Sequence, residues 1–167
     1  MYKIKLLILL PISIFFLSCS NQPQSYNSSK YSLSYIGGGY DGLLLKNFFV
    51  ANLKSFNQYD QNSIIKISAN IDHDTDIFIT NIDNTSDRSK IASSLSVKIY
   101  NQEQECFLFN EEFTVSQFYI YAPGDKFLSN QTAVKNIKSE NTETLVKKAI
   151  ISINNNPLSC KYEHQSS

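Results

Sequence analysis

The stretch that decides the fold is Ile91–Tyr100, which reads Ile-Ala-Ser-Ser-Leu-Ser-Val-Lys-Ile-Tyr. Its bulky apolar residues stand two positions apart, which is the period of a strand with one buried and one exposed face. The polar residues 101–105 follow as a turn, and the alternation resumes at Phe107 and Phe109 on a return strand that can reach Tyr121. These two stretches predict an antiparallel hairpin.

Two further strands are expected before the hairpin. Residues 65–71 alternate isoleucine and alanine with polar side chains, and residues 31–35 alternate Tyr, Leu and Tyr with Ser. The earlier of these strands ends at the glycines 37–39. The segment 73–90 is rich in Asp, Asn, Thr and Ser. It is expected to form either strand ends joined by a long turn or a mobile loop.

Two helices complete the expected set of elements. Asp41 can cap the first helix, whose apolar residues recur at spacings of three and four. These residues are Leu45, Phe48, Phe49, Leu53 and Phe56. The second helix runs from about Asn130 to Asn154, with Ser129 or Asn130 as its cap. Asn141 interrupts its apolar side.

The order strand-helix-strand-strand-strand-helix predicts an α+β fold, a two-layer sandwich. Both helices are expected on one face of a single, mostly antiparallel four-stranded sheet. Residues 31–167 are predicted to form one domain, because a chain of about 150 residues normally builds a single core.

The N-terminus has the pattern of an export signal. Two lysines precede an apolar run over residues 6–17, which is followed by Ser18 and Cys19. The run is shorter than the roughly twenty residues that span a bilayer, so residues 1–18 are predicted to be a signal peptide. A small residue before a cysteine at this place is typical of a bacterial lipoprotein, and we expect Cys19 to carry acyl chains such as palmitate. The alternative is an ordinary signal with a coincidental cysteine.

Residues 19–30 are polar and predict a flexible tether between the lipid and the domain. Ser20 stands where an aspartate would favour the inner membrane. By resemblance to other Gram-negative lipoproteins, this indicates the periplasmic side of the outer membrane. The other two cysteines, Cys106 and Cys160, form an even pair in an oxidising compartment, and we expect a disulfide. Two free thiols are the alternative.

Several classes of function have little support. Fifteen basic and fifteen acidic residues leave no broad positive field, so nucleic acid is not expected as a partner. Residues 37–42 match the GxGxxG pattern of dinucleotide sites, but a strand-to-helix turn fits better because an antiparallel hairpin follows. Residues 72–76 read Asp-His-Asp-Thr-Asp and suggest a calcium or zinc site, but they lack the EF-hand pattern. A solvated turn is preferred, and no metal or cofactor is assigned.

Catalysis is not expected either. The two histidines, His73 and His164, stand in no nucleophile motif. Glu111 and Glu112 are adjacent on a strand and therefore face opposite sides of the sheet, which does not suit a shared acid and base pair. The basic residues near loops and on the last helix could contact lipid phosphates, or they form a solvated face. They are Arg88, Lys90, Lys126, Lys135 and Lys138.

The C-terminal half resembles a known family. Asp87-Arg88-Ser89 opens a strand, residues 112–118 close the hairpin, and residues 128–133 lead into residues 138–147 on the last helix. This pattern of hairpin, alanine-bearing segment and acidic amphipathic helix resembles the LPS-assembly lipoprotein LptE family. The resemblance covers about residues 31–153. A departure is the polar tether, where many family members have a glycine and an aromatic residue after the lipidated cysteine.

The resemblance implies an outer-membrane lipoprotein whose domain plugs the large β-barrel subunit of the lipopolysaccharide translocon, LptD. It also implies that the domain helps that barrel assemble and contacts lipopolysaccharide, with Arg88 and Lys138 at the most comparable positions. Two alternatives stay open. One is an accessory lipoprotein of another envelope transport or secretion machine, and the other is a metal-binding or ligand-binding lipoprotein that uses the acidic stretch.

Overall fold

The computed structural model describes residues 29–79, 87–121 and 127–160. The predicted signal, Cys19, most of the tether, Lys126 and His164 lie outside these ranges. The elements are β1 (Ser32–Gly37), α2 (Gly39–Ser55), β2 (Ile65–Ile79), β3 (Asp87–Asn101), β4 (Cys106–Tyr121) and α3 (Phe127–Asn155). The predicted order of strands and helices is therefore confirmed.

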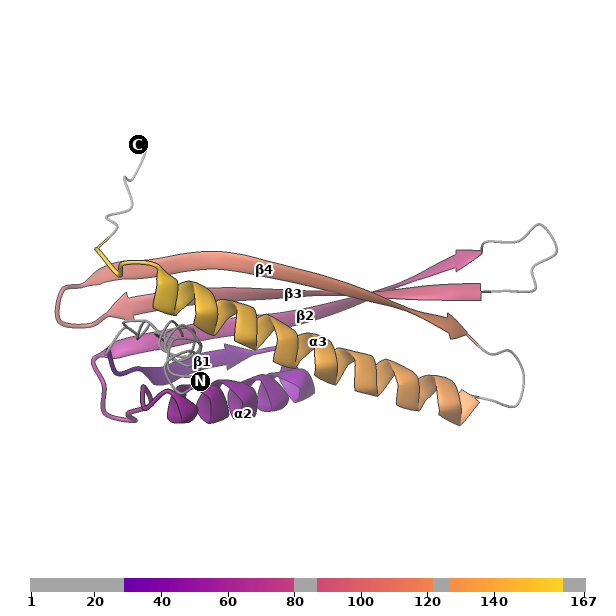
Figure 1. Cartoon of the computed structure of the whole chain (residues 1–167), viewed down its shortest axis with the longest axis horizontal. Helices are drawn as coiled ribbons and strands as arrows, with labels where there is room; N and C mark the ends of the chain where they lie inside the picture. The colour runs from indigo at the N-terminus through magenta and orange to yellow at the C-terminus, as the bar shows by residue number, and fades with distance from the viewer. Residues whose placement is uncertain (1–28, 80–86, 122–126, 161–167) are drawn as a thin grey trace, which may run out of the picture.

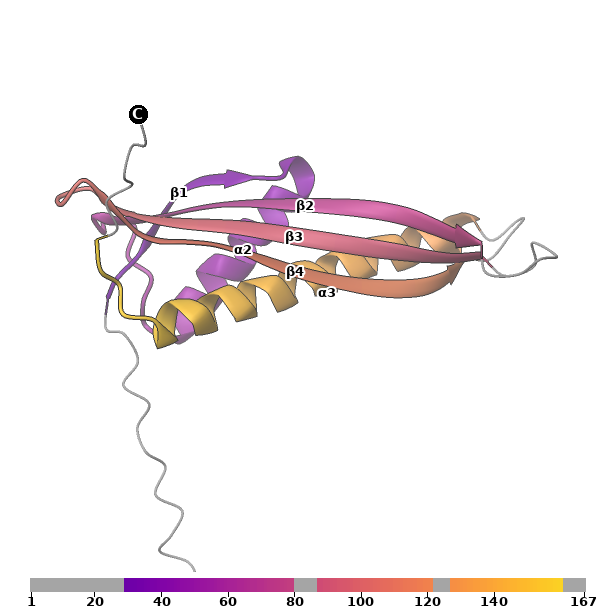
Figure 2. The ribbon, with the colours of Figure 1, turned by 90° about the horizontal axis from the view of Figure 1, so that it is seen from above.

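The four strands form one sheet in the order β1-β2-β3-β4. β1 runs parallel to β2, while the other two neighbouring pairs are antiparallel. A parallel neighbour requires a crossover, and α2 supplies it. Figures 1 and 2 show both helices along the sheet. The predicted α+β fold, with two helices on a mostly antiparallel four-stranded sheet, is confirmed.

The core lies between the helices and one face of the sheet. Its members come from both helices and from every second position of the strands. They include Leu45, Phe49, Leu53, Ile67, Ala69, Ile71, Leu95, Val97, Ile99, Leu145, Ala149, Ile150 and Ile153. The intervening side chains of the strands point to the other side of the sheet, which we call the open face. Ser94, Ser96, Thr114 and Ser116 lie on the open face.

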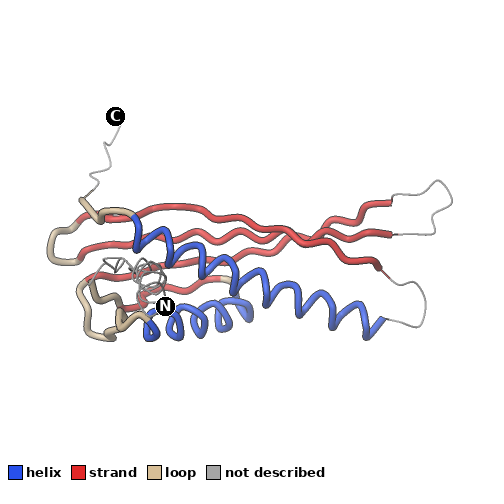
Figure 3. The backbone as a smooth tube through the Cα atoms, viewed as in Figure 1, coloured by secondary structure: helices blue, strands red, loops and turns tan. Residues whose placement is uncertain are grey.

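The elements differ in length. α2 has 17 residues, whereas α3 has 29 and β2 to β4 have 15 or 16 each. Figure 3 shows that α3 lies beside the long strands and extends past the point where α2 begins. β1 is shorter still, and its pairing with β2 ends at Asn70. From Asp72 onward, no strand among the described residues pairs with the outer edge of β2.

The acidic stretch 72–76 is not a turn, and that prediction was wrong. It lies within β2, and the ladder between β2 and β3 continues to the pair Ile79 and Asp87. Of the two expectations for residues 73–90, strand ends are confirmed over the described part. Pairing with a neighbouring strand outweighs the weak strand preference of Asp and Ser, because the ladder satisfies the backbone and the open face keeps these polar side chains in water.

Two irregularities in strand pairing were not visible in the sequence. Between Leu33 and Ile36 the register of β1 against β2 shifts, so Tyr35 is exposed and Ile36 packs on the core instead. A second shift lies opposite Tyr100, where Leu108 is the extra residue. Phe107 packs its ring against Tyr100, while Leu108 is buried. One extra residue in a strand moves each later side chain to the opposite face.

The helix starts also differ from the predictions. α2 begins at Gly39 with Gly38 as its N-cap, and Asp41 lies in its first turn. Gly38 has φ of 111°, a conformation that favours glycine. A Cβ at Gly42 would lie 2.8 Å from the carbonyl oxygen of Gly37, so the start of α2 can pack closely on the end of β1. α3 begins two residues before Ser129, so neither residue proposed as its cap is one.

A disulfide joins Cys106 to Cys160 in the structure. It ties the segment after α3 to the first residue of β4, across 54 positions of sequence. A cross-link of this kind stabilises a protein mainly by restricting the unfolded chain, and it is typically worth about 2–4 kcal/mol.

We expect reduction of this bond to lower the free energy of unfolding by about 2–4 kcal/mol. The measurement is thermal unfolding of the purified protein with and without a reducing agent. The double variant Cys106→Ala with Cys160→Ala is the control, and its midpoint should not respond to the reductant. Equal midpoints for the unchanged protein in both conditions would contradict the expectation.

Candidate functional site

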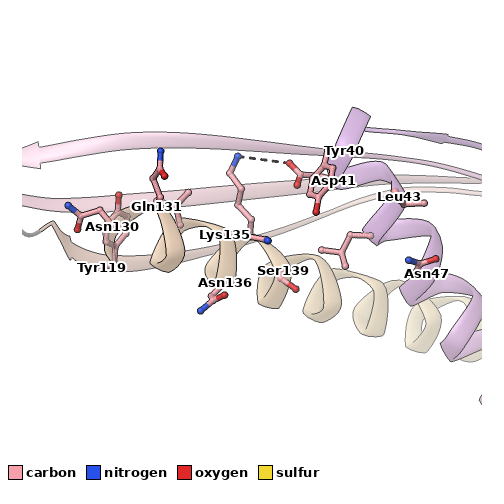
Figure 4. Close-up of a pocket in the computed structure, with 13 residues that line it drawn as sticks. Tyr40, Asp41, Leu43, Asn47, Tyr119, Asn130, Gln131, Lys135, Asn136 and Ser139 are labelled. Carbon is pink, nitrogen blue, oxygen red and sulfur yellow. Dashed lines mark ion pairs between the residues drawn. The ribbon is translucent and has the colours of Figure 1, made fainter. Parts of the chain in front are cut away.

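A pocket opens where the first turns of α2 face the first half of α3. Its volume is about 600 Å³, which falls within the range of about 300–1,000 Å³ usual for small-molecule sites. In Figure 4, Asp41 and Leu43 approach it from α2, while Lys135 and Ser139 approach it from α3. The bulky apolar and aromatic members of its lining are Tyr40, Leu43, Leu44, Tyr119 and Val134.

The pocket exists because the two helices start at different places. The glycines after β1 place the start of α2 near the middle of the long strands, whereas α3 starts near the far end of β4. The first turns of α3 therefore extend past the start of α2, and side chains from the first half of α3 line the pocket at spacings of three and four residues. Those side chains are Gln131, Val134, Lys135, Lys138 and Ser139.

The charged groups of the pocket lie on both of its walls. Lys138 Nζ from α3 is 4.0 Å from Asp41 Oδ2 of α2, and this ion pair is drawn in Figure 4. Both side chains are about one-third exposed. Lys135 adds a second ammonium one turn earlier on α3. The two lysines and one aspartate make the charge of this cluster positive.

Behind Asp41, the core ends in a group of polar side chains that we call the polar layer: His73, Ser93, Asn141 and Thr142. His73 Nδ1 lies 2.7 Å from Ser93 Oγ, and His73 Nε2 lies 3.4 Å from Thr142 Oγ1. Asn141 Nδ2 donates to Ser93 Oγ at 2.9 Å. Asn141 is fully buried, and its Oδ1 has no hydrogen-bond partner among the described residues.

The polar layer contacts the pocket through Asp41. The side chain of His73 is 2% exposed, and its Nε2 lies 3.9 Å from Asp41 Oδ2. Burial lowers the pKa of His73 below its ordinary value of 6.5, with the charge on Lys138 acting in the same direction. Asp41 and Asp72 oppose this shift and do not overcome it. The imidazole is therefore neutral in the folded protein at neutral pH.

The structure separates the two basic residues that the family resemblance selected. Lys138 lines the pocket on the helix side of the sheet. Arg88 is exposed on β3 beside the buried Ser89, so it points to the open face. Lys90 shares that face. Lys138 is instead brought together with Lys135.

The acidic stretch is split by the alternation of β2. His73 lies on the core side of the sheet, in the polar layer. Asp72, Asp74 and Asp76 alternate with it along the strand and therefore lie on the open face. Among the described ranges, no three side chains of His, Cys, Asp or Glu come close enough to hold a metal ion.

Sequence reasoning missed most of the site. Asp41 was expected to be a helix cap, and His73 to lie in a solvated turn. Asn141 gave one signal, because it interrupts an apolar helix face at the position where the polar layer begins. Tyr119 carried no such signal, since its place in the pocket depends on how far β4 extends.

The polar layer predicts a pH dependence of stability. His73 has a lower pKa when folded than when unfolded, so the unfolded chain takes up the proton first. The contribution of neutral His73 is present above about pH 6.5 and is lost as the pH falls toward the folded-state pKa. We expect His73→Gln to flatten this part of the profile of unfolding free energy against pH, measured by denaturant titration. The control His164→Gln should keep the slope, and an unchanged slope in His73→Gln would contradict the assignment.

No helix within the described ranges is both long enough and apolar enough to cross a membrane. No protein-family model and no curated protein sequence matches this chain.

Solved structures do match its fold. A minor lipoprotein from Acinetobacter baumannii aligns with a TM-score of 0.60 and 14% identity, over 82% of this chain and 98% of that one. The rare lipoprotein B from Shewanella oneidensis gives a TM-score of 0.61 and 9% identity, over 75% and 93% of the two chains. Lipoprotein B from Nitrosomonas europaea gives 0.58 and 8%, over 83% and 90%. This chain therefore shares its fold with these three bacterial lipoproteins.

Proposed function

We propose that this chain is a lipid-anchored outer-membrane protein that docks in the β-barrel of an LptD-type lipopolysaccharide translocon. There it helps the barrel assemble and helps lipopolysaccharide reach the cell surface. The observation that carries the proposal is that the described domain has the fold of named lipoproteins over nearly all of their length. The predicted export signal that ends at Cys19 agrees with it. The role requires no catalytic step.

The open face of the sheet supports a docking role. Helices cover one side of β2 to β4, whereas the other side presents small hydroxyl side chains from two long neighbouring strands. Ser94 is paired with Thr114 across the strands, and Ala92 with Ser116. Small side chains let another protein surface approach the sheet closely, so the open face suits a large rigid partner.

The far end of the open face has the chemistry for a lipid with phosphates. Arg88 on β3 is opposite Ile120 on β4, and Lys90 is opposite Phe118. Phe118 and Ile120 are 62% and 72% exposed. Cations beside exposed apolar side chains fit a ligand that presents phosphates next to acyl chains, as lipopolysaccharide does.

The lipid anchor can be tested directly. We expect Cys19→Ser to abolish incorporation of radiolabelled palmitate in the host and to move the protein out of the membrane fraction, because one thiol carries the anchor. The double variant Cys106→Ala with Cys160→Ala should still be labelled. Labelling that survives in Cys19→Ser would contradict the assignment of this cysteine.

The docking role is tested by mild-detergent capture of the tagged, lipidated protein from its own host, followed by mass spectrometry. We expect a large outer-membrane barrel in equimolar amount. Ser116→Arg, which places a bulky cation on the open face, should reduce its recovery at least about tenfold. Thr144→Arg is the matched control, because Thr144 is exposed on α3, and it should leave recovery unchanged.

Two results would contradict the proposal. Recovery of an inner-membrane transporter or a secretion subunit would assign the chain to another envelope machine. Equal recovery of the barrel by both arginine variants would mean that docking does not use the open face.

A further inference from the structure

The pocket between α2 and α3 has two chemically different parts. Its apolar part is formed by leucine, valine and tyrosine side chains, and two of these are strongly exposed: Tyr40 at 76% and Leu43 at 60%. Its polar part holds the ammonium groups of Lys135 and Lys138. Large exposed apolar side chains beside a cavity are characteristic of binding sites.

The ammonium of Lys138 has hydrogen-bonding capacity to offer a ligand. It carries three donors, and its distance of 4.0 Å from Asp41 Oδ2 is longer than a hydrogen bond. Its partner Asp41 also lies 3.9 Å from His73 Nε2, so the carboxylate is held between α3 and the polar layer. A ligand anion can therefore approach Lys138 from the pocket.

We propose that this pocket binds a single alkyl chain that ends in an anionic head group. The chain lies along Leu43, Leu44 and Val134, and the anion lies beside Lys138 and Lys135. The apolar lining accounts for the chain, and the excess of two ammonium groups over one carboxylate accounts for the sign of the head group. The site lies on the helix side of the sheet, away from the open face, and does not depend on a partner barrel.

Photo-crosslinking tests the site on the full-length lipidated protein in phosphatidylcholine vesicles. The probe is a fatty acid with a diazirine at the end of its chain, and crosslinked residues are identified by mass spectrometry. We expect labelling in two peptides, those containing residues 40–47 and 130–139. Laurate should compete with the probe, whereas dodecanol, which lacks the charge, should compete at least about tenfold less well.

The source of the ligand is distinguished by a second competitor. Lysophosphatidylglycerol offers one chain and a phosphodiester, and laurate offers one chain and a carboxylate. Stronger competition by the lysolipid would assign the pocket to a membrane lipid, and stronger competition by laurate would assign it to a free fatty acid. Both outcomes support the proposal, because the shared chemistry is an alkyl chain with one anionic end.

Matched variants separate specific binding in the pocket from non-specific hydrophobic association of the probe with the protein surface. Lys138→Gln should reduce labelling severalfold, whereas Lys147→Gln, on the same helix but ion-paired with Glu143, should not. Asp41→Asn should increase labelling, because it removes the carboxylate that competes with the ligand for Lys138. Leu43→Glu should abolish labelling, while Ile151→Glu, at a position 58% exposed on α3, should leave it unchanged.

Three results would overturn the proposal: labelling spread over the whole chain, equal competition by dodecanol and laurate, or equal labelling of Lys138→Gln and Lys147→Gln. Thermal unfolding of each variant identifies any that fails to fold, and the dodecanol comparison needs no variant. Since crosslinking uses no barrel and barrel capture uses no fatty acid, failure of one proposal is distinguishable from failure of the other.

Discussion

The structure depends on a mismatch between the length of its sheet and the length of the helix that shares the core with α3. The 17 residues of α2 span about 26 Å, whereas the 29 residues of α3 span about 44 Å. Strands of 15 or 16 residues extend about 50 Å. Two helices therefore cover only part of the sheet. Where the second helix is missing, an unbroken apolar face would be left in water.

The residues of the covered face change at that boundary. Ile71 and Leu95 are a buried pair on adjacent strands, and the next pair on the same face is His73 with Ser93. Asn141 then meets these side chains from α3. The polar layer and the pocket both lie where α2 begins, partway along the long strands. Asp41 links them, because it lies close to both His73 and Lys138.

The sequence predicts those parts of the fold that depend on local periodicity. Alternation over 65–71 and 91–100 identified two strands and their buried faces, and the spacing of Leu45, Phe49 and Leu53 identified the buried side of α2. Features that depend on pairing between distant strands were not predictable. The register shift that exposes Tyr35 leaves no trace in composition, and His73 looked like part of a solvated turn. The pairing of Lys138 with Asp41 depends on the angle between two helices, which no local pattern encodes.

The short first strand has a consequence for self-association. Because no described strand pairs with β2 beyond Asn70, the outer edge of β2 offers backbone groups to which a strand from another molecule could be added. That edge carries Asp72, Asp74 and Asp76. Two copies meeting edge to edge would bring six carboxylates together, and their mutual repulsion opposes the stacking of strands that leads to fibrils. The acidic stretch, considered in the sequence as a possible metal site, thus opposes edge-to-edge pairing of β2 with a second copy of this chain.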